Sequence, residues 1–169
     1  MKTKFLVVLS LVTLAVFGFG NIARGQNEVT ESVTTSYYGT SKVLPLGPNR
    51  GYVTWESFAV VISDTGEGLF HTATLRCTGA YFAEKGSWEG EGYGTYTLKD
   101  GEKVFMSFKH GGKMGTPTPP SQGTAKLIGG TGKYSEIQGR TEFTSYPVRP
   151  SAEGISQMYN KAKIIYKLP

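Results

Sequence analysis

The residues best suited to chemistry are one carboxylate, one imidazole and one thiol. Glu56 alternates with Phe58 in an apolar strand pattern, and His71 and Cys77 share a face of the next expected strand. If the face with Glu56 points into the protein, lost hydration raises the pKa of its carboxyl, as a general acid or base requires. If it points outward, Glu56 is a solvated side chain. Glu56 and His71 are therefore our catalytic candidates.

The histidines and the cysteine also have purely structural explanations. His71 suits a hydrogen-bonded position in a strand wall. Cys77 lies among apolar neighbours, and a nucleophilic thiol needs a cationic neighbour to lower its pKa, so an inert buried thiol is expected. His71 and His110 lack the spacing of metal ligands. We expect no metal and no cofactor.

Aromatic residues flank a glycine-rich strand that suits a binding cavity. Glycine recurs at every second position from Gly90 to Gly94, between Trp88 and Tyr96. A strand face without Cβ atoms can bend or accept an aromatic ring against its backbone. The candidate cavity residues are Phe58, Cys77, Trp88 and Tyr96. Core packing alone is the alternative explanation for Trp88 and Tyr96.

Two turns are defined by their glycines. Asp100-Gly101 is typical of a hairpin turn, because both residues tolerate the positive φ that such turns need. The run from Gly129 to Gly132 reverses the chain between two apolar segments. It is not a phosphate-binding loop, because Tyr134 follows Lys133 where serine or threonine is required and no helical pattern comes next.

Alternating, β-branched and aromatic residues predict an all-β chain. The expected strands cover residues 29–38, 52–63, 69–82, 87–98, 103–109, 123–128, 134–145 and 155–168. Expected loops join them at 44–51, 110–122 and 146–154, with a short helix from Ser151 as an alternative. Eight short antiparallel strands favour a closed barrel, which leaves no exposed edges. A β-sandwich is the main rival.

The N-terminus has the pattern of a secretory signal peptide over residues 1–25. Lys2 and Lys4 precede an apolar run, and small residues precede a cut after Gly25. An uncleaved anchor is the alternative. Residues 26–169 then form a single domain. A lone cysteine excludes an internal disulfide, which favours a bacterial periplasmic or secreted protein over a small disulfide-rich scaffold.

The charge of the mature chain is small. Lys2, Lys4 and Arg24 are three of the 18 basic residues, so 15 remain against 13 acidic residues, a net charge of +2. The sequence contains no dense basic run. A balance of this kind gives no reason to expect nucleic-acid binding. After removal of the signal peptide, we also expect no membrane association.

Four short segments stand out: Trp55-Glu56, Cys77-Thr78-Gly79, residues 100–103, and residues 129–134 with Ile137 and Gly139. Together they resemble the allene oxide cyclase-like and dirigent β-barrel superfamily, nearest to secreted bacterial members of uncharacterised function. The resemblance implies an eight-stranded antiparallel, calycin-like barrel with an apolar cavity, often oligomeric. It does not carry catalytic residues to this chain position by position.

Three functions remain open. The first is binding of a small apolar or aromatic molecule in the cavity, without a defined reaction. The second is a cofactor-free cyclase or isomerase, as in relatives that steer a reactive intermediate. The third is a structural or interaction protein whose barrel is filled by side chains. Whichever function holds, the long loop at residues 110–122 is a candidate for a lid or for a contact between copies of a homo-oligomer.

Overall fold

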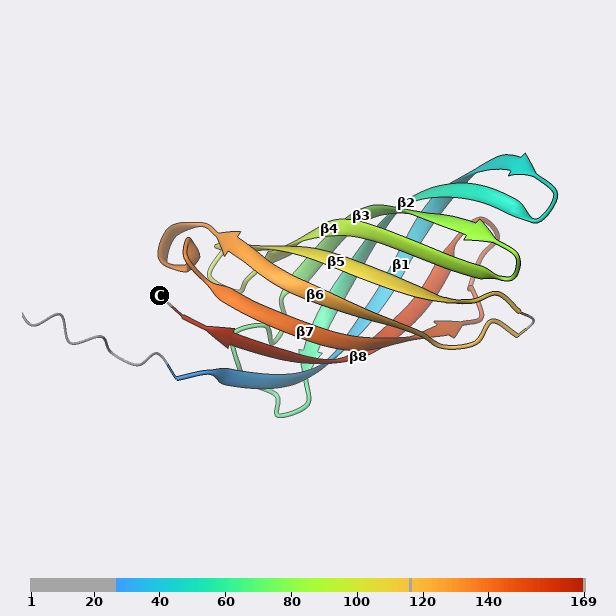
Figure 1. Cartoon of the computed structure of the whole chain (residues 1–169). Helices are drawn as coiled ribbons and strands as arrows, with labels where there is room; N and C mark the ends of the chain where they lie inside the picture. Colours follow the sequence, from blue (N-terminus) through green and yellow to red (C-terminus); the bar gives the residue numbers. More distant parts are fainter. Residues whose placement is uncertain (1–26, 116, 169) are drawn as a thin grey trace, which may run out of the picture.

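The computed structural model describes residues 27–115 and 117–168, and its strands close into one antiparallel barrel (Figure 1). Each strand pairs with its neighbours in sequence, and β1 pairs with β8 to complete the circle. The elements are β1 (Val29–Gly47), β2 (Arg50–Ser63), β3 (Thr74–Glu84), β4 (Ser87–Thr97), β5 (Lys103–Lys113), β6 (Ser121–Gly130), a 3-10 turn η1 (Gly132–Tyr134), β7 (Gln138–Val148) and β8 (Ser156–Lys167). The predicted eight-stranded barrel is confirmed, and the sandwich is excluded.

The alternation of buried and exposed residues follows the pleat of each strand. In β5, Val104, Met106 and Phe108 are buried, whereas Lys103 and Lys109 are exposed. Short hairpins join most strands, since adjacent antiparallel strands need only a few connecting residues. The sequence pattern therefore sets the number of strands and which residues share a face of each strand.

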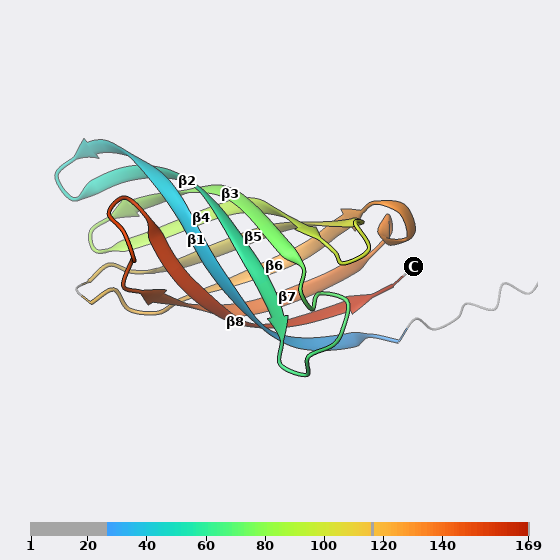
Figure 2. The same cartoon turned by 180° about the vertical axis from the view of Figure 1, so that it is seen from behind.

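The β1–β2 hairpin is longer than the sequence predicted. Residues 44–51 were expected to be a loop, but β1 continues to Gly47 and β2 starts at Arg50. The reversal occurs at Gly47 and Asn49, which have φ of 124° and 56°. Pairing with β8 ends at Gly39, so the last part of β1 stands out from the barrel wall (Figures 1 and 2). Pro45 is compatible with a strand because β1 has no partner on its β8 side there, and Pro48 lies in the turn itself.

Strand β3 begins five residues later than predicted. Residues 69–73 belong to a loop that folds across one end of the barrel, where Phe70 and Ala73 are fully buried. The carboxylate of Glu31 holds this loop, because it accepts the backbone N–H groups of Leu69 at 2.7 Å and Phe70 at 3.2 Å. Residues 69–73 therefore resemble a strand in sequence because some of these loop residues are buried in the end of the barrel.

Packing closes this end of the barrel. Phe70 meets Tyr96 and Tyr166 edge-on, with ring centroids 4.8 Å and 5.5 Å apart. The hydroxyl of Tyr166 also donates to Glu31, at 2.5 Å. Ile137, from the segment that leads into β7, is fully buried beside this cluster. The closed end therefore supplies most of the continuous apolar core.

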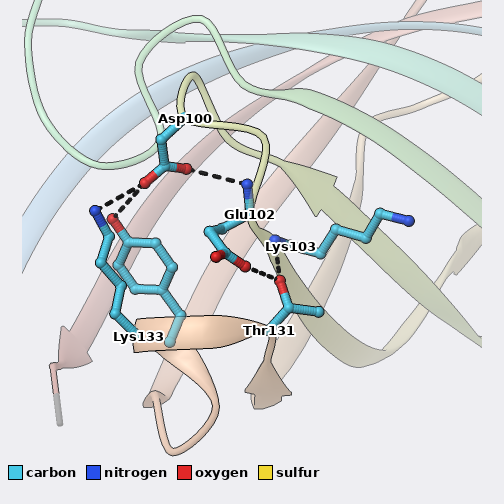
Figure 3. A network of polar contacts seen from close by, with 6 residues as sticks. Asp100, Glu102, Lys103, Thr131 and Lys133 are labelled. Carbon is cyan, nitrogen blue, oxygen red and sulfur yellow. Dashed lines mark hydrogen bonds and ion pairs between the residues drawn. The ribbon is translucent and has the colours of Figure 1, made fainter.

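The two glycine turns of the sequence meet at the closed end (Figure 3). The Asp100 carboxylate accepts a hydrogen bond from the backbone N–H of Glu102 and pairs with the Lys133 ammonium at 2.9 Å. The Thr131 hydroxyl donates to the Glu102 carboxylate and accepts the Lys103 backbone N–H. These contacts tie the β4–β5 hairpin to the β6–β7 turn. The motif residues at both turns thus have a structural role in this chain.

The β6–β7 turn differs slightly from its predicted form. A 3-10 turn follows Thr131, so β7 begins at Gln138 rather than at Tyr134. Gly132 has a φ of 53°, and a Cβ there would overlap the Glu102 carboxylate. The alternative short helix after Ser151 is not observed: residues 151–154 form bends and turns.

Two expectations concern the N-terminus and membranes. The predicted signal peptide, residues 1–25, lies outside the residues that the structure describes. Over the described ranges, no helix is long and apolar enough to cross a membrane.

Candidate functional site

A cavity of about 540 Å³ occupies the half of the barrel opposite the closed end. It is lined by inward-facing side chains of the strands and by the loops that follow β5 and β7. Met114, Pro119, Pro150 and Ile155 border its mouth. A volume of this size is within the range of small-molecule pockets, and it far exceeds the space of a few waters. The interior is therefore hollow, which disfavours a barrel filled by side chains.

Aromatic rings surround a histidine on the cavity wall. His110 contacts Trp88, Phe108 and Trp55 edge-on, with ring centroids 4.7 Å, 5.5 Å and 5.8 Å apart. Tyr81 packs on Trp88 from β3, with centroids 5.2 Å apart. We call His110, Trp55, Trp88 and Phe108 the aromatic box. Flat apolar surfaces of this kind suit a flat apolar ligand.

Glycines on neighbouring strands make room for these rings. A Cβ on Gly79 would lie 2.9 Å from the Trp55 ring, and a Cβ on Gly92 would lie 2.6 Å from the Phe108 ring. A Cβ on Gly123 would overlap the ring of Phe143. The prediction that a glycine-cleared strand accepts an aromatic ring against its backbone is confirmed.

His110 is held neutral by its surroundings. Burial among apolar rings lowers the pKa of its imidazole from 6.5 to about 4, because the charged form loses hydration. At neutral pH the ring therefore has one N–H group and one lone pair. A neutral imidazole can accept a proton or a hydrogen bond from a bound molecule.

Four buried polar atoms have no hydrogen-bond partner within the described part of the chain. They are Trp55 Nε1, His110 Nε2, Thr141 Oγ1 and Asn160 Oδ1. All four residues line the cavity. An unpaired buried polar atom costs free energy, on the order of 1–3 kcal/mol, so native proteins usually pair such atoms with water or ligand. Their gathering around one cavity marks it as the candidate site.

The other ionisable groups of the cavity interior are uncharged. Burial raises the pKa of the Cys77 thiol to about 12 and also raises the pKa values of Tyr37 and Tyr96. All three groups keep their protons at neutral pH. Cys77 is therefore the inert thiol that its neighbours suggested, in a wall of the cavity.

Glu56 and Phe58 require correction. In β2 the residues with odd numbers, such as Ala59, face inward, so Glu56 and Phe58 point outward. The Glu56 carboxylate pairs with Arg76 at 2.6 Å on the outer surface, although the residue borders the cavity wall. Phe58 is 39% exposed and stacks on Tyr38. The prediction that these two side chains face the interior of the barrel is therefore wrong.

His71 lies at the closed end, away from the cavity. Its Nδ1 atom accepts the backbone N–H of Ser63 at 3.3 Å, which matches the wall role considered for it. The structure thus does not bring the two catalytic candidates, Glu56 and His71, together. Of the predicted cavity residues, Cys77, Trp88 and Tyr96 do line the cavity.

The sequence reasoning missed most of the aromatic box. The expected strand ended at residue 109, but β5 continues to Lys113 and so places His110 in phase with Phe108. Extending the alternation by one residue would have revealed His110. Trp55 entered only through the segment Trp55-Glu56. Its alternation with the buried Val53 would have predicted its inward position.

The described residues contain no group of three or more histidine, cysteine, aspartate or glutamate side chains that could hold a metal ion. No protein-family model matches the sequence, and no curated protein matches it. A solved structure, that of the pterocarpan synthase dirigent protein GePTS1, matches with a TM-score of 0.49 and 13% sequence identity. The match covers 95% of this chain and 100% of that one. The barrel assignment here follows from the strand pairing itself.

Proposed function

We propose that this protein binds a small, mostly apolar molecule with a flat ring system in its barrel cavity. The observation that carries the proposal is the hollow interior of about 540 Å³ with the aromatic box on its wall. The wall also carries a few polar side chains, among them Thr141 and Asn160, which is the usual composition of a small-molecule pocket.

Intrinsic fluorescence offers a direct test. The chain has two tryptophans, Trp55 and Trp88, and both line the cavity. A ligand in the cavity should change the tryptophan emission with a saturable dose response. Screening flat aromatic compounds and lipids by this signal, with native mass spectrometry to give the stoichiometry, would identify binders.

A matched pair of variants separates cavity binding from surface binding. Ala162 lines the cavity and is part of the inner face of β8, so Ala162→Phe should reduce binding at least tenfold by occupying the space. Thr54 points outward on β2, so Thr54→Phe adds the same ring outside and should leave binding unchanged. Absence of any binder across the screen, or equal effects of both variants, would refute the proposal.

A cofactor-independent cyclase or isomerase is the second candidate function. The favouring observation is the neutral imidazole of His110 in the cavity wall, since proton transfer needs such a group in contact with substrate. Glu56 does not fill this role from the outer surface. If His110→Phe left every measurable conversion intact, His110 would be excluded as the acid or base.

Export to a bacterial periplasm or to the exterior, and assembly into a homo-oligomer, are part of the proposal. The first rests on residues 1–25 and the second on the superfamily resemblance. Fractionation of the expressed full-length chain, with mass analysis of its N-terminus, tests export. Light scattering of the mature chain tests assembly.

A further inference from the structure

The aromatic box contains a hydrogen-bonding group that has no assigned role, the imidazole of His110. This inference rests on the proposed ligand-binding function and concerns the choice of ligand. His110 lies on β5, is half-buried and lines the cavity. Its Nε2 atom is sealed among the rings and has no partner in the described chain. The other ring nitrogen, Nδ1, is not among the buried unpaired atoms and has no hydrogen bond within the described residues, so it is the nitrogen that a ligand can reach.

The surrounding rings favour one arrangement of the imidazole proton. Trp88, Phe108 and Trp55 all meet the His110 ring at steep angles, 85°, 88° and 61°. An N–H group among aromatic rings is weakly satisfied by their faces, whereas a lone pair on Nε2 has no donor within hydrogen-bonding distance in the described chain. These surroundings assign the proton to the sealed Nε2 and leave the Nδ1 lone pair for a molecule in the cavity.

The charges around the cavity indicate what that molecule is. Among the described lining residues, the thiol and phenol groups are protonated and His110 is neutral. The charged lining residues are Glu56, paired with Arg76 outside, and Lys113, exposed at the mouth. The cavity interior therefore offers no counter-charge, and a buried ion without one is costly.

We propose that His110 selects the ligand by accepting a hydrogen bond at Nδ1 from a hydroxyl or N–H group of an uncharged, flat molecule held in the aromatic box. The ring of the ligand packs against Trp55 and Trp88. The donor group of the ligand points at the imidazole. His110 is thus a specificity-determining residue of the cavity.

Three probes of nearly the same shape test this. 2-Naphthol has a hydroxyl donor, 2-methoxynaphthalene has none, and 2-naphthoate is an anion. Calorimetric titration of the mature chain at pH 7 should show 2-naphthol binding roughly five- to tenfold more tightly than 2-methoxynaphthalene, the usual net effect of one neutral hydrogen bond. 2-Naphthoate should bind the weakest of the three.

Two variants assign the preference to His110. His110→Phe keeps a ring in the box but removes the acceptor, so the preference for 2-naphthol should disappear while 2-methoxynaphthalene still binds. His71→Phe changes the histidine at the closed end and should keep the preference. A circular dichroism melt of each variant confirms that the barrel is folded.

The outcomes are distinguishable. If both neutral probes bind equally to the natural chain, or if the preference survives in His110→Phe, the role of His110 is refuted while cavity binding stands. If 2-naphthoate binds most tightly, the cationic Lys113 at the mouth governs selection and the inference is wrong. If none of the three binds and the wider ligand screen is also empty, the proposed function itself fails.

Discussion

At the scale of single residues, burial decides which groups of this chain have chemistry to offer. Glu56 and His110 are both ionisable residues of barrel strands, but the pleat directs Glu56 outward and His110 inward. The outward carboxylate pairs with Arg76 in water, where such a pair contributes little. The inward imidazole loses hydration, which changes its protonation.

Glu31 is the buried residue whose role is most clearly structural. Its carboxylate accepts hydrogen bonds from the N–H groups of Leu69 and Phe70 and from the Tyr166 hydroxyl. Glu31→Gln removes the charge and sets an NH₂ group against buried donors, so we expect a loss of about 2–4 kcal/mol in unfolding free energy. Urea denaturation measures it. Glu67→Gln, an exposed residue of the same loop, should stay within about 0.5 kcal/mol of the natural chain. Equal midpoints for the two variants would contradict this role.

At the scale of elements, β4 shows why a strand of this barrel has glycine at its inward-facing positions. Glycine at every second position on its inner face leaves the Phe108 ring room to lie against the backbone at Gly92. Between Trp88 and Tyr96 the inner face of this strand contributes little apolar burial of its own. Its stability comes from pairing with β3 and β5 over its full length.

Substitution of one of these glycines should be costly. In Gly92→Ala the new Cβ lies 2.6 Å from the Phe108 ring and also overlaps the carbonyl oxygen of Thr78. We expect a loss of about 1–3 kcal/mol from overpacking, measured by thermal or urea unfolding. The matched control is Gly51→Ala on β2, where the nearest atom lies 3.7 Å away. If Gly51→Ala were as destabilising as Gly92→Ala, backbone flexibility rather than contact with the ring would explain both.

At the scale of the whole molecule, the barrel has one packed end and one hollow end. Phe70 and Ile137 fill the closed end together with the network around Asp100 and Thr131 (Figure 3). The other half encloses the cavity, and there the β1–β2 hairpin extends beyond the pairing with β8. The tightly packed core and the candidate cavity therefore lie in different halves of one barrel.

The burial of His110 in the cavity wall should make the free energy of unfolding of the barrel depend on pH. The pKa of His110 is about 4 when folded and about 6.5 when unfolded, so the unfolded chain binds the proton more tightly. The contribution of the neutral His110 ring to the free energy of unfolding is fully present above pH 6.5. It is lost as the pH falls toward 4, which lowers the free energy of unfolding by up to about 3 kcal/mol. His110→Phe lacks this component. Urea unfolding of both proteins from pH 7.5 to 4 measures the difference, and parallel curves would contradict it.

The sequence alone determined the strand number and the antiparallel hairpins, because alternation and glycine turns are local signals, and it favoured a closed barrel over a sandwich. The Asp100-Gly101 hairpin and the turn after Gly130 are where they were expected. The inner face of β4, with Trp88 and Tyr96, was also readable, since glycines marked it. Strand ends were less certain: the β1–β2 loop and the start of β3 were both placed wrongly.

Only the tertiary structure decided which ionisable groups face the cavity. The phase of Glu56 along β2 was visible in the sequence, but both faces of that strand carry apolar residues, so its direction was not. Phe58, Val60 and Ile62 remain exposed on the outer wall. The aromatic box joins β2, β4 and β5, and no local pattern records which residues meet across three strands. A period of two fixes which residues share a face, but only the closure of the barrel fixes which face is inside.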